Sequence, residues 1–489
     1  MAERTRSAAL GGDVLIYGLG NVLVAALNFG LFAVFARHLA PADYGAMSLI
    51  VTVSSAVSMF GMMGMNNAVQ RFFFDDPSDA VQRRVWGSGF LGGLGMTVTF
   101  AVAATVLAFV FLSRSQPALG GNASLIAFAT VLPQTVVVWL QDRARLQFRA
   151  RYCVLLALGQ VSVGGVAGTF FVVHCGGGLA GFFLGTAVGA VITAVFGLLT
   201  TPALRPLVYS RCEFLRLLRF GAPFVPAGLA MWASTTVLRW ELAHFKDLDA
   251  VGVFDVAWKF AAPVWLLNAA VGQAFGPYAF RLRAEDPDYR SKLIQLLHIL
   301  GGLALTVSCA LAVFAQELCA LVAPAAYAGA AVPCAVLSFA FYFSSLHQVA
   351  ALGIAFAEQP RLIAYGWCGA ALMGALAGLA LVPVAGAAGT AWSLVLVYAG
   401  LTLFYVRCTQ RLHPLPFQLG PLVIQITVGL ASVGVAAFAD GHPISGLGVS
   451  MKLACLAGLT GAVIAWGGID VARVRTTVVN FLSTRRVRQ

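Results

Sequence analysis

Runs of about 20 predominantly apolar residues recur along the whole chain, and short turns between them carry most of its charge. A run of this length is what an α-helix needs to cross the hydrocarbon core of a bilayer. Only 10% of the 489 residues are charged and 60% are hydrophobic, so the chain cannot cover a folded core with a polar surface. The sequence therefore predicts an all-α integral membrane protein and excludes a soluble globular domain.

Fourteen segments have the length and hydropathy of a membrane-spanning helix. They cover residues 13–37, 43–65, 85–112, 122–141, 152–174, 178–200, 220–243, 250–280, 293–315, 330–356, 361–383, 386–406, 418–439 and 446–469. The turns at Gly176–Gly178 and Pro383–Gly386 are very short. We keep the flanking segments apart because either pair, if merged, would be about twice as long as a bilayer is thick. Pro223 and Pro226 predict a bend at the start of the seventh segment.

The basic residues predict the topology of these segments. With the N-terminus placed inside, 25 of the 31 basic residues fall in inward loops and tails, four fall outside and two lie within spans. The positive-inside rule then places both termini in the cytoplasm. The net charge of +12 follows the membrane topology, and we expect no nucleic-acid partner. The first apolar run is too long for a cleaved signal peptide, so it is expected to be a retained first helix.

The chain has no recognisable catalytic or metal-binding motif. Its nine cysteines are scattered without a C-x-x-C pair, and its seven histidines never fall into a spacing such as H-E-x-x-H. A phosphate-binding loop is absent, and the longest external connection, 316–329, contains one carboxylate, Glu317. We therefore expect no enzyme, no metal and no cofactor. A membrane glycosyltransferase or polymerase stays the least favoured alternative because the outer loops leave little room for its site.

A recurring residue pair suggests an internal duplication. An aromatic or apolar residue followed by glycine occurs at Tyr17-Gly18 and Tyr44-Gly45, and again about two hundred residues later at Phe220-Gly221 and Val251-Gly252. Repeats in transporters place the substrate site between the halves. We expect two six-helix lobes around a central cavity, followed by two C-terminal helices. The expected boundaries are an N-lobe at 1–200, a cytoplasmic linker at 201–219, a C-lobe at 220–406, two additional spans within 407–469 and a basic cytoplasmic tail at 470–489.

Four charged residues lie inside the seventh and eighth segments: Arg239, Glu241, Asp255 and Lys259. A charge near the bilayer centre costs roughly 2.5 to 3.5 kcal/mol on insertion scales, so helices that served only as anchors would not carry them. Asp255 and Lys259 are spaced i, i+4 and are predicted to pair on one helix face. Arg239 and Glu241 are about 200° apart around a helix and cannot face the same way. Two alternatives stay open, an internal ion pair that lowers insertion cost and an interfacial position for Glu241.

Three segments resemble bacterial polysaccharide flippases of the MATE-like multidrug, oligosaccharidyl-lipid and polysaccharide exporter superfamily, including the O-antigen (Wzx-like) flippases. These segments are 36–45 (ARHLAPADYG), 217–226 (LLRFGAPFVP) and 250–259 (AVGVFDVAWK). The sequence departs from the family pattern at two places. Leu238 stands before Arg239 where an acid is common, and Asp255 stands where a serine is more usual, whereas Lys259 fits the basic position of the family.

The resemblance implies transport of an oligosaccharide linked to undecaprenyl pyrophosphate across the bacterial inner membrane by alternating access. The product would be O-antigen, capsule or exopolysaccharide. A polysaccharide polymerase and export machinery are open as further partners, and coupling to a proton or sodium gradient is open as well. Arginine suits phosphate because its planar fork of donors always keeps its charge.

The candidate site residues divide into two groups. Candidate substrate-binding residues are Arg37 at the outer end of span one, Arg71 at the inner end of span two, Arg239 and Lys259. Asp255 and Glu241 are candidates for ion coupling or charge pairing. The main alternative function is a cation-coupled multidrug exporter of the same superfamily, for which acidic rather than basic cavity residues would be expected.

Overall fold

The computed structural model describes residues 2–73, 75–76, 78–112, 121–147, 149–201, 207–439 and 446–466. All regular elements in these ranges are helices, as the sequence predicts. The described chain divides into two compact units, residues 1–232 and 233–489, with the boundary inside the helix α10 (Phe224–Phe245). The tail expected at 470–489 and residues 202–206 of the expected linker lie outside the described residues. The other lobe boundaries expected from the sequence stay a prediction.

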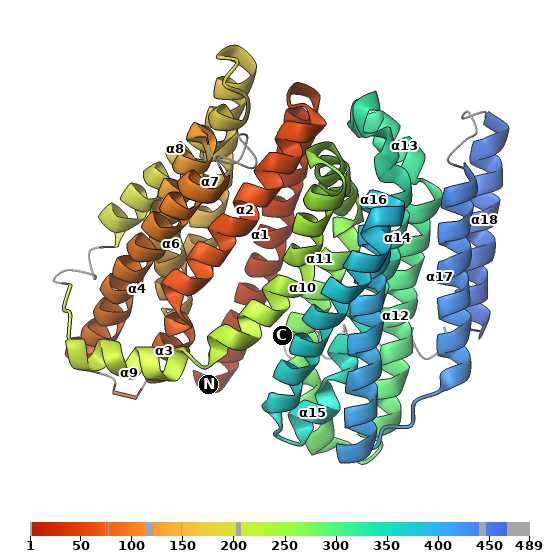
Figure 1. Cartoon of the computed structure of the whole chain (residues 1–489). Coiled ribbons are helices and arrows are strands. Elements are labelled where there is room, and N and C mark those ends of the chain that lie inside the picture. Colours follow the sequence, from red (N-terminus) through yellow and green to blue (C-terminus); the bar gives the residue numbers. More distant parts are fainter. Residues whose placement is uncertain are drawn as a thin grey trace. The chain divides into compact units, whose positions relative to one another are not determined.

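The first unit is a bundle of long helices with one short helix across its end (Figure 1). Its elements in chain order are α1 (Ala2–His38), α2 (Pro41–Met62), α3 (Met65–Phe72), α4 (Asp79–Leu107) with the π-helical turn η1 (Ala108–Leu112), α6 (Asn122–Leu146), α7 (Ala150–Thr169) with the π-helical turn η2 (Phe170–His174), α8 (Gly178–Thr200) and α9 (Arg211–Gly221). A buried aromatic core that includes Trp86, Phe90 and Trp139 joins α4 to α6. This core holds the end of the unit on which α3 and α9 lie.

Glycines bring α7 and α8 into close contact. A Cβ atom at Gly185 would lie 2.2 Å from the Cα of Gly168, and one at Gly189 would lie 2.6 Å from the Cα of Gly164. Each helix therefore presents a G-x-x-x-G stripe to the other, the pattern by which small residues let membrane helices approach. The two helices are joined at Gly176–Gly178, so the split predicted at this turn is confirmed.

The second unit is arranged around the helix α14 (Ala331–Ala350), which is buried along almost its whole length. Its other elements are the end of α10, α11 (Leu248–Glu285), α12 (Tyr289–Val313), α13 (Ala315–Val322), the 3-10 turn η4 (Ala325–Ala330), α15 (Leu352–Phe356), α16 (Pro360–Leu412), α17 (Leu419–Ala439) and α18 (Gly446–Trp466). Helices α11, α12, α16 and α17 pack against α14. A helix surrounded in this way can be mostly apolar all round, and α14 carries no Asp, Glu, Lys or Arg.

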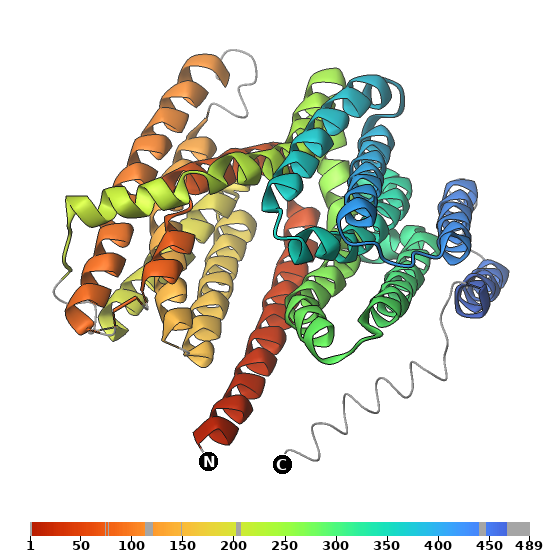
Figure 2. The same ribbon diagram turned by 90° about the horizontal axis from the view of Figure 1, so that it is seen from below.

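Helix α16 is a hairpin of two membrane-length halves. Its chain reverses at Gly386, whose φ of 52° and ψ of −128° are outside the helical region. The two halves pack against each other, since the Tyr405 hydroxyl donates a hydrogen bond to the Ile363 carbonyl (3.0 Å) and a Cβ at Gly400 would lie 2.2 Å from the Met373 side chain. Figure 2 shows the turn that joins them. The split predicted at Pro383–Gly386 is therefore confirmed.

Eleven described helices are long and apolar enough to cross a membrane, and the bent pair of α9 and α10 makes a twelfth. The pair bends by 46° at Ala222 and Pro223, where the sequence predicts a bend. Because α16 contains two halves of membrane length and α18 falls on the described part of the last predicted segment, each of the fourteen predicted segments overlaps helix in the described chain. Residues 467–469 of the last segment lie outside the described residues. The protein is a multi-pass, all-α membrane protein.

Candidate functional site

The α10–α11 hairpin carries all four charged residues that the sequence singles out. Its turn is fixed by Asp247, whose Oδ1 accepts a hydrogen bond from the Ala250 amide (2.7 Å) at the N-cap of α11. Arg239 lies six residues before the end of α10, and Asp255 lies seven residues after the start of α11. A hairpin of antiparallel helices places such positions at the same depth, so the turn brings these two side chains together.

Arg239 forms a buried ion pair with Asp255. Its Nε donates to Oδ1 of Asp255 over 3.0 Å, and the two side chains are only 10% and 13% exposed. A second donor, Nη1, bonds to the Thr235 carbonyl at 3.0 Å. The guanidinium also lies over the rings of Trp258 and Phe254, with centroids 4.7 and 5.3 Å from Cζ. Hydrogen bonds and cation–π contacts thus hold this charge in an apolar surrounding.

The predicted pairing of Asp255 with Lys259 is wrong. No carboxylate in the described chain lies within 4.0 Å of the Lys259 ammonium, although the side chain is half-buried in α11. Asp255 turns toward α10 instead, because Arg239 offers it a rigid donor at the same depth. Lys259 is left as a cation near the pair and without an ion-pair partner of its own.

Glu241 faces a different neighbour from Arg239, as the spacing of the two residues predicts. A Cβ atom at Gly378 of α16 would lie 1.7 Å from Oε2 of Glu241, so the carboxylate rests directly against this glycine. That oxygen is buried and has no hydrogen-bond partner in the described chain. Glu241 therefore packs against α16 in the second unit but is only half-buried, and the interfacial position left open above stays a prediction.

Neutral polar side chains bridge the helices behind this site. The Asn268 amide donates to the Phe341 carbonyl at 2.8 Å, and the Ser345 hydroxyl donates to the Asn268 side-chain oxygen. One helix further, the Tyr342 hydroxyl donates to Oε1 of Gln425 (2.9 Å). Hydrogen bonds between membrane helices of this kind hold the bundle together, so the structure gives these side chains a bridging role.

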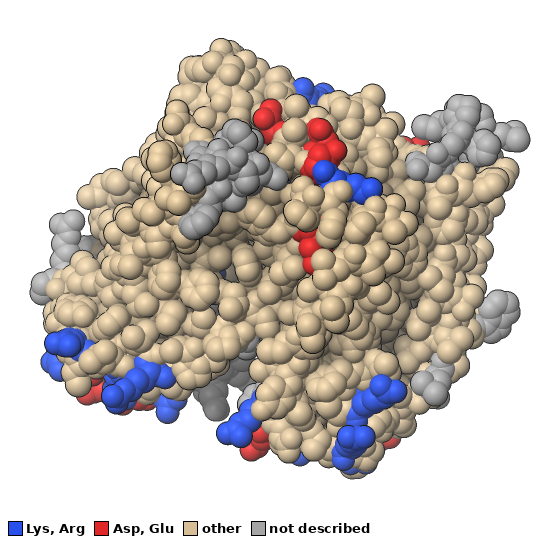
Figure 3. All heavy atoms as spheres, viewed as in Figure 1, with Lys and Arg blue, Asp and Glu red and all other residues tan. Residues whose placement is uncertain are grey.

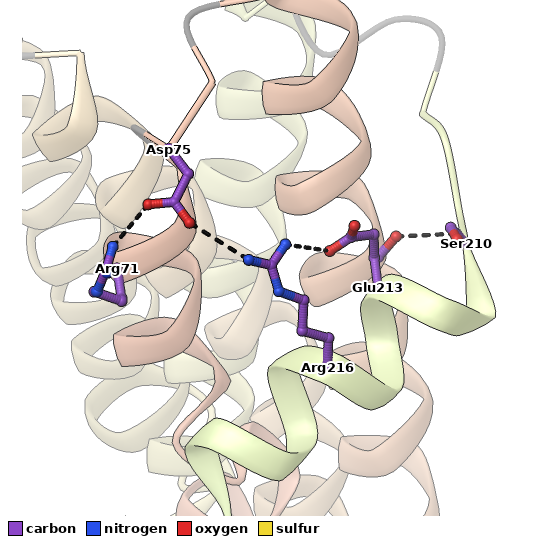
Figure 4. Close-up of polar contacts among 6 residues, drawn as sticks. Arg71, Asp75, Ser210, Glu213 and Arg216 are labelled. Atoms are coloured by element: carbon purple, nitrogen blue, oxygen red, sulfur yellow. Dashed lines mark hydrogen bonds and ion pairs between the residues drawn. The ribbon is translucent and has the colours of Figure 1, made fainter.

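In the first unit, Arg71 belongs to an exposed charge network, the α3–α9 brace, formed with Asp75, Glu213 and Arg216 (Figure 4). Asp75 accepts from Arg71 at 2.7 Å through Oδ1 and from Arg216 at 3.4 Å through Oδ2. Arg216 also lies 3.6 Å from Glu213 and stacks over the Phe72 ring at 4.1 Å. The brace therefore ties the end of α3 to α9, which runs across that end of the unit (Figure 1).

Arg37 lies in the last turn of α1 and is exposed. It belongs to the first unit, and its role in binding the substrate stays a prediction.

Sequence reasoning treats Arg143 as one more inward-facing arginine, but the structure buries it. Arg143 is 5% exposed and lies in the last turn of α6, beside the buried Asp142, whose Oδ1 accepts a hydrogen bond from Arg145 at 2.8 Å. No sequence pattern separates Arg143 from its exposed neighbours, because burial here depends on α3 and α4 packing over the end of α6.

The model of the polysaccharide biosynthesis protein family matches residues 34–332, more than half of the chain. The chain belongs to this family. Every candidate residue of the two units, from Arg37 to Lys259, lies inside the matched segment. No curated protein matches the sequence of this polysaccharide biosynthesis family member.

Solved structures with the same fold include a lipid flippase and transporters. The lipid II flippase MurJ in an inward closed conformation is 10% identical, with a TM-score of 0.74 over 92% of this chain and 98% of that chain. An inward-facing multidrug resistance MATE family transporter of the MOP superfamily is 14% identical, with a TM-score of 0.60 over 85% and 95%. A MOP superfamily transporter from Pyrococcus furiosus is 14% identical, with a TM-score of 0.55 over 88% and 96%. At such identities the likeness shows the fold, and the predicted MATE-like fold of this family member is confirmed.

Proposed function

We propose that this chain is a flippase that moves an oligosaccharide linked to undecaprenyl pyrophosphate across the bacterial inner membrane for surface polysaccharide biosynthesis. Membership of the polysaccharide biosynthesis protein family and the fold shared with the lipid II flippase MurJ support a lipid-linked substrate. The head group would travel from the cytoplasmic to the periplasmic leaflet by alternating access, while the prenyl chain stays in the lipid. Both termini would lie in the cytoplasm.

The observation that carries this proposal is Lys259, an ammonium inside a membrane helix with no described carboxylate within 4.0 Å, although Asp255 acts on it over a longer distance. Such a charge in a span is costly unless it is hydrated or meets a counter-ion, so it marks a candidate site for an anion. Arg239 is engaged by Asp255 at 3.0 Å and would have to exchange this partner for the pyrophosphate. We infer that Lys259 meets the substrate first and that Asp255 competes with the pyrophosphate for Arg239.

Ion coupling is proposed at the acids of the same hairpin. Glu241 has a buried oxygen without a hydrogen-bond partner, which a proton or a sodium ion would satisfy. This oxygen also favours the second candidate function, a cation-coupled multidrug exporter, because the fold is shared with MATE transporters. Dissipating the proton gradient and the sodium gradient separately during transport would show which of them, if either, drives it.

Reconstituted vesicles test the flippase proposal directly. We expect the wild-type chain to expose a labelled polyprenyl-pyrophosphate oligosaccharide on the far leaflet, and Lys259→Ala to slow this at least tenfold. Lys246→Ala is the matched control, since this exposed lysine lies in the turn of the same hairpin. Transport of organic cations with no flipping of the lipid substrate would select the exporter. Unchanged flipping by a double Arg239→Ala and Lys259→Ala variant would show that the α10–α11 hairpin is not part of the substrate-binding site.

In cells, loss of the chain is expected to remove a surface polysaccharide and to leave lipid-linked units facing the cytoplasm. Wild-type chain should restore the polysaccharide, and Lys259→Ala should not. Any polymerase or export machinery that works with this chain would be recovered by cross-linking in the same strain.

A further inference from the structure

Arg143 is held between two aromatic rings at the end of the first unit that carries α9. Its Cζ lies 5.2 Å from the Phe73 ring centroid and 5.4 Å from that of Trp86. Phe73 follows the last residue of α3, and Trp86 lies in the second turn of α4. Three separate segments therefore enclose this guanidinium. The ring of Phe72, which precedes Phe73, contacts a different guanidinium, that of Arg216 in the exposed brace.

The hydrogen-bonding groups of Arg143 are not satisfied by this enclosure. Nε and Nη1 are buried, and neither has a hydrogen-bond partner in the described chain. Ring faces attract the charge of a guanidinium, but its N–H donors point outward in its own plane, where only an acceptor can satisfy them. Trp86 contributes another buried donor without a partner, Nε1. No acceptor in the described chain bonds to these three donors.

The carboxylates of this end do not supply the missing acceptor. Oδ1 of Asp142 accepts from Arg145, and its buried Oδ2 has no hydrogen-bond partner, so it does not bond to Arg143 either. Both oxygens of Asp75 are used by Arg71 and Arg216. Asp79 is close enough to act on Arg143 electrostatically, but Arg83 opposes it and neither forms a hydrogen bond with Arg143. Two donors of this buried cation are therefore open to an acceptor from outside the described chain.

We propose that Arg143 binds a phosphate-type anion at the α9 end of the first unit. The planar fork of an arginine matches the tetrahedral oxygens of phosphate and bonds two of them at once. The arginines of the α3–α9 brace surround this end, where Figure 3 shows basic side chains gathered in the region of α9. They would raise the local concentration of anions. The anion has two chemical sources, a soluble phosphate or diphosphate and the phosphate of a lipid head group, and the proposal does not depend on the proposed function.

Thermal unfolding of the full chain tests the site, with each probe added at constant ionic strength set by potassium chloride. Inorganic pyrophosphate in detergent represents the soluble source, and nanodiscs of phosphatidylglycerol compared with phosphatidylcholine represent the lipid source. We expect at least one probe to raise the unfolding temperature of the wild type by several degrees. A response to pyrophosphate in detergent identifies a soluble ligand, and a response confined to phosphatidylglycerol identifies a lipid head group.

Arg143→Met keeps the length of the side chain and removes its charge, so it should abolish the shift. Arg143→Lys keeps the charge and loses the fork, and should weaken the apparent affinity about tenfold or more. Lys246→Met is the matched control, because this exposed lysine belongs to the second unit and its loss should keep the wild-type shift. If Arg143→Met does not fold, the thermal shift of Arg143→Lys tests the proposal instead. A wild type that responds to neither probe, or an Arg143→Lys variant that binds as the wild type does, overturns the proposal.

Discussion

Two of the arginine–aspartate contacts in the described chain have similar geometry in opposite surroundings. In the second unit Arg239 and Asp255 are 3.0 Å apart and 10% and 13% exposed, whereas Arg71 and Asp75 of the first unit are 2.7 Å apart and 60% and 40% exposed. Distance alone would rank the exposed pair as the stronger. Solvent screens an exposed pair and leaves a buried charge costly when its partner is removed, so burial reverses the order.

Replacing Asp255 with alanine is expected to have the largest effect. It leaves Arg239 buried with no carboxylate at Nε, and breaking a buried pair in this way costs about 3 to 5 kcal/mol. The measurement is the free energy of unfolding in mixed micelles. A double Arg239→Met, Asp255→Leu variant is the control, since it removes both charges and should recover most of the loss. If the single and the double variants are equally unstable, the loss comes from packing and the comparison with the exposed pair fails.

Gly64→Ala is expected to have an intermediate effect. It disturbs the backbone contact between the start of α3 and the end of α9 and leaves the charges of the brace unchanged. Gly64 has a φ of 66°, and a Cβ atom there would lie 2.4 Å from the carbonyl oxygen of Gly221 at the end of α9. Backbone strain and overpacking together should cost about 1 to 3 kcal/mol. Gly18→Ala, where no atom lies within 4 Å of the added Cβ, is the control. A loss at Gly64 no larger than that at Asp75 would mean that ion pairs, not backbone contact, hold α9 in place.

Asp75→Asn is expected to cost less than about 1 kcal/mol, even though it breaks two ion pairs at once. The loss should shrink further in concentrated salt, because screening already weakens exposed pairs. Unfolding of wild type and variant at low and high potassium chloride measures both effects. The loss at Asp255 should be nearly independent of salt, and equal salt dependence at the two sites would break the distinction drawn from burial.

The sequence predicts those parts of the fold that depend on local hydropathy. All fourteen segments and both short turns follow from apolar length and from glycine and proline, and the different directions of Arg239 and Glu241 follow from helical spacing. Helical spacing does not predict the ion-pair partner of Asp255. Spacing along one helix favours Lys259, and only the packing of α10 on α11 brings Arg239 closer.

Two further features depend on contacts between distant segments. The burial of Arg143 arises from Phe73 and Trp86, which are 70 and 57 positions before it in the chain. The close crossing of α7 and α8 does have a sequence signal, since Gly164 with Gly168 and Gly185 with Gly189 both read G-x-x-x-G. In a chain with 52 glycines that signal is hard to separate from chance until the helix pair is known.

The smallest effect is expected at His413. This side chain is half-buried, so its burial lies between that of the Arg239–Asp255 pair and that of the Arg71–Asp75 pair. Its Nε2 lies 2.7 Å from the Tyr289 hydroxyl, which in turn accepts a hydrogen bond from Nε of Arg290 at 3.2 Å. The Tyr289 hydroxyl can donate to Nε2 in the neutral tautomer that leaves this nitrogen unprotonated. Burial, followed by the charges of Arg290 and Arg283, lowers the pKa of His413 below its usual value.

The unfolded chain then binds this proton more readily than the folded one, so stability should fall as the pH drops below about 6.5, the usual pKa of histidine. Unfolding temperatures of wild type and His413→Gln between pH 7.5 and 5.5 measure this. The wild type should lose slightly more than the variant, whose side chain does not titrate. If the unfolding temperatures of wild type and variant change with pH in parallel, the half-buried position of His413 has no measurable effect on stability. This contact would then behave like the exposed Arg71–Asp75 pair.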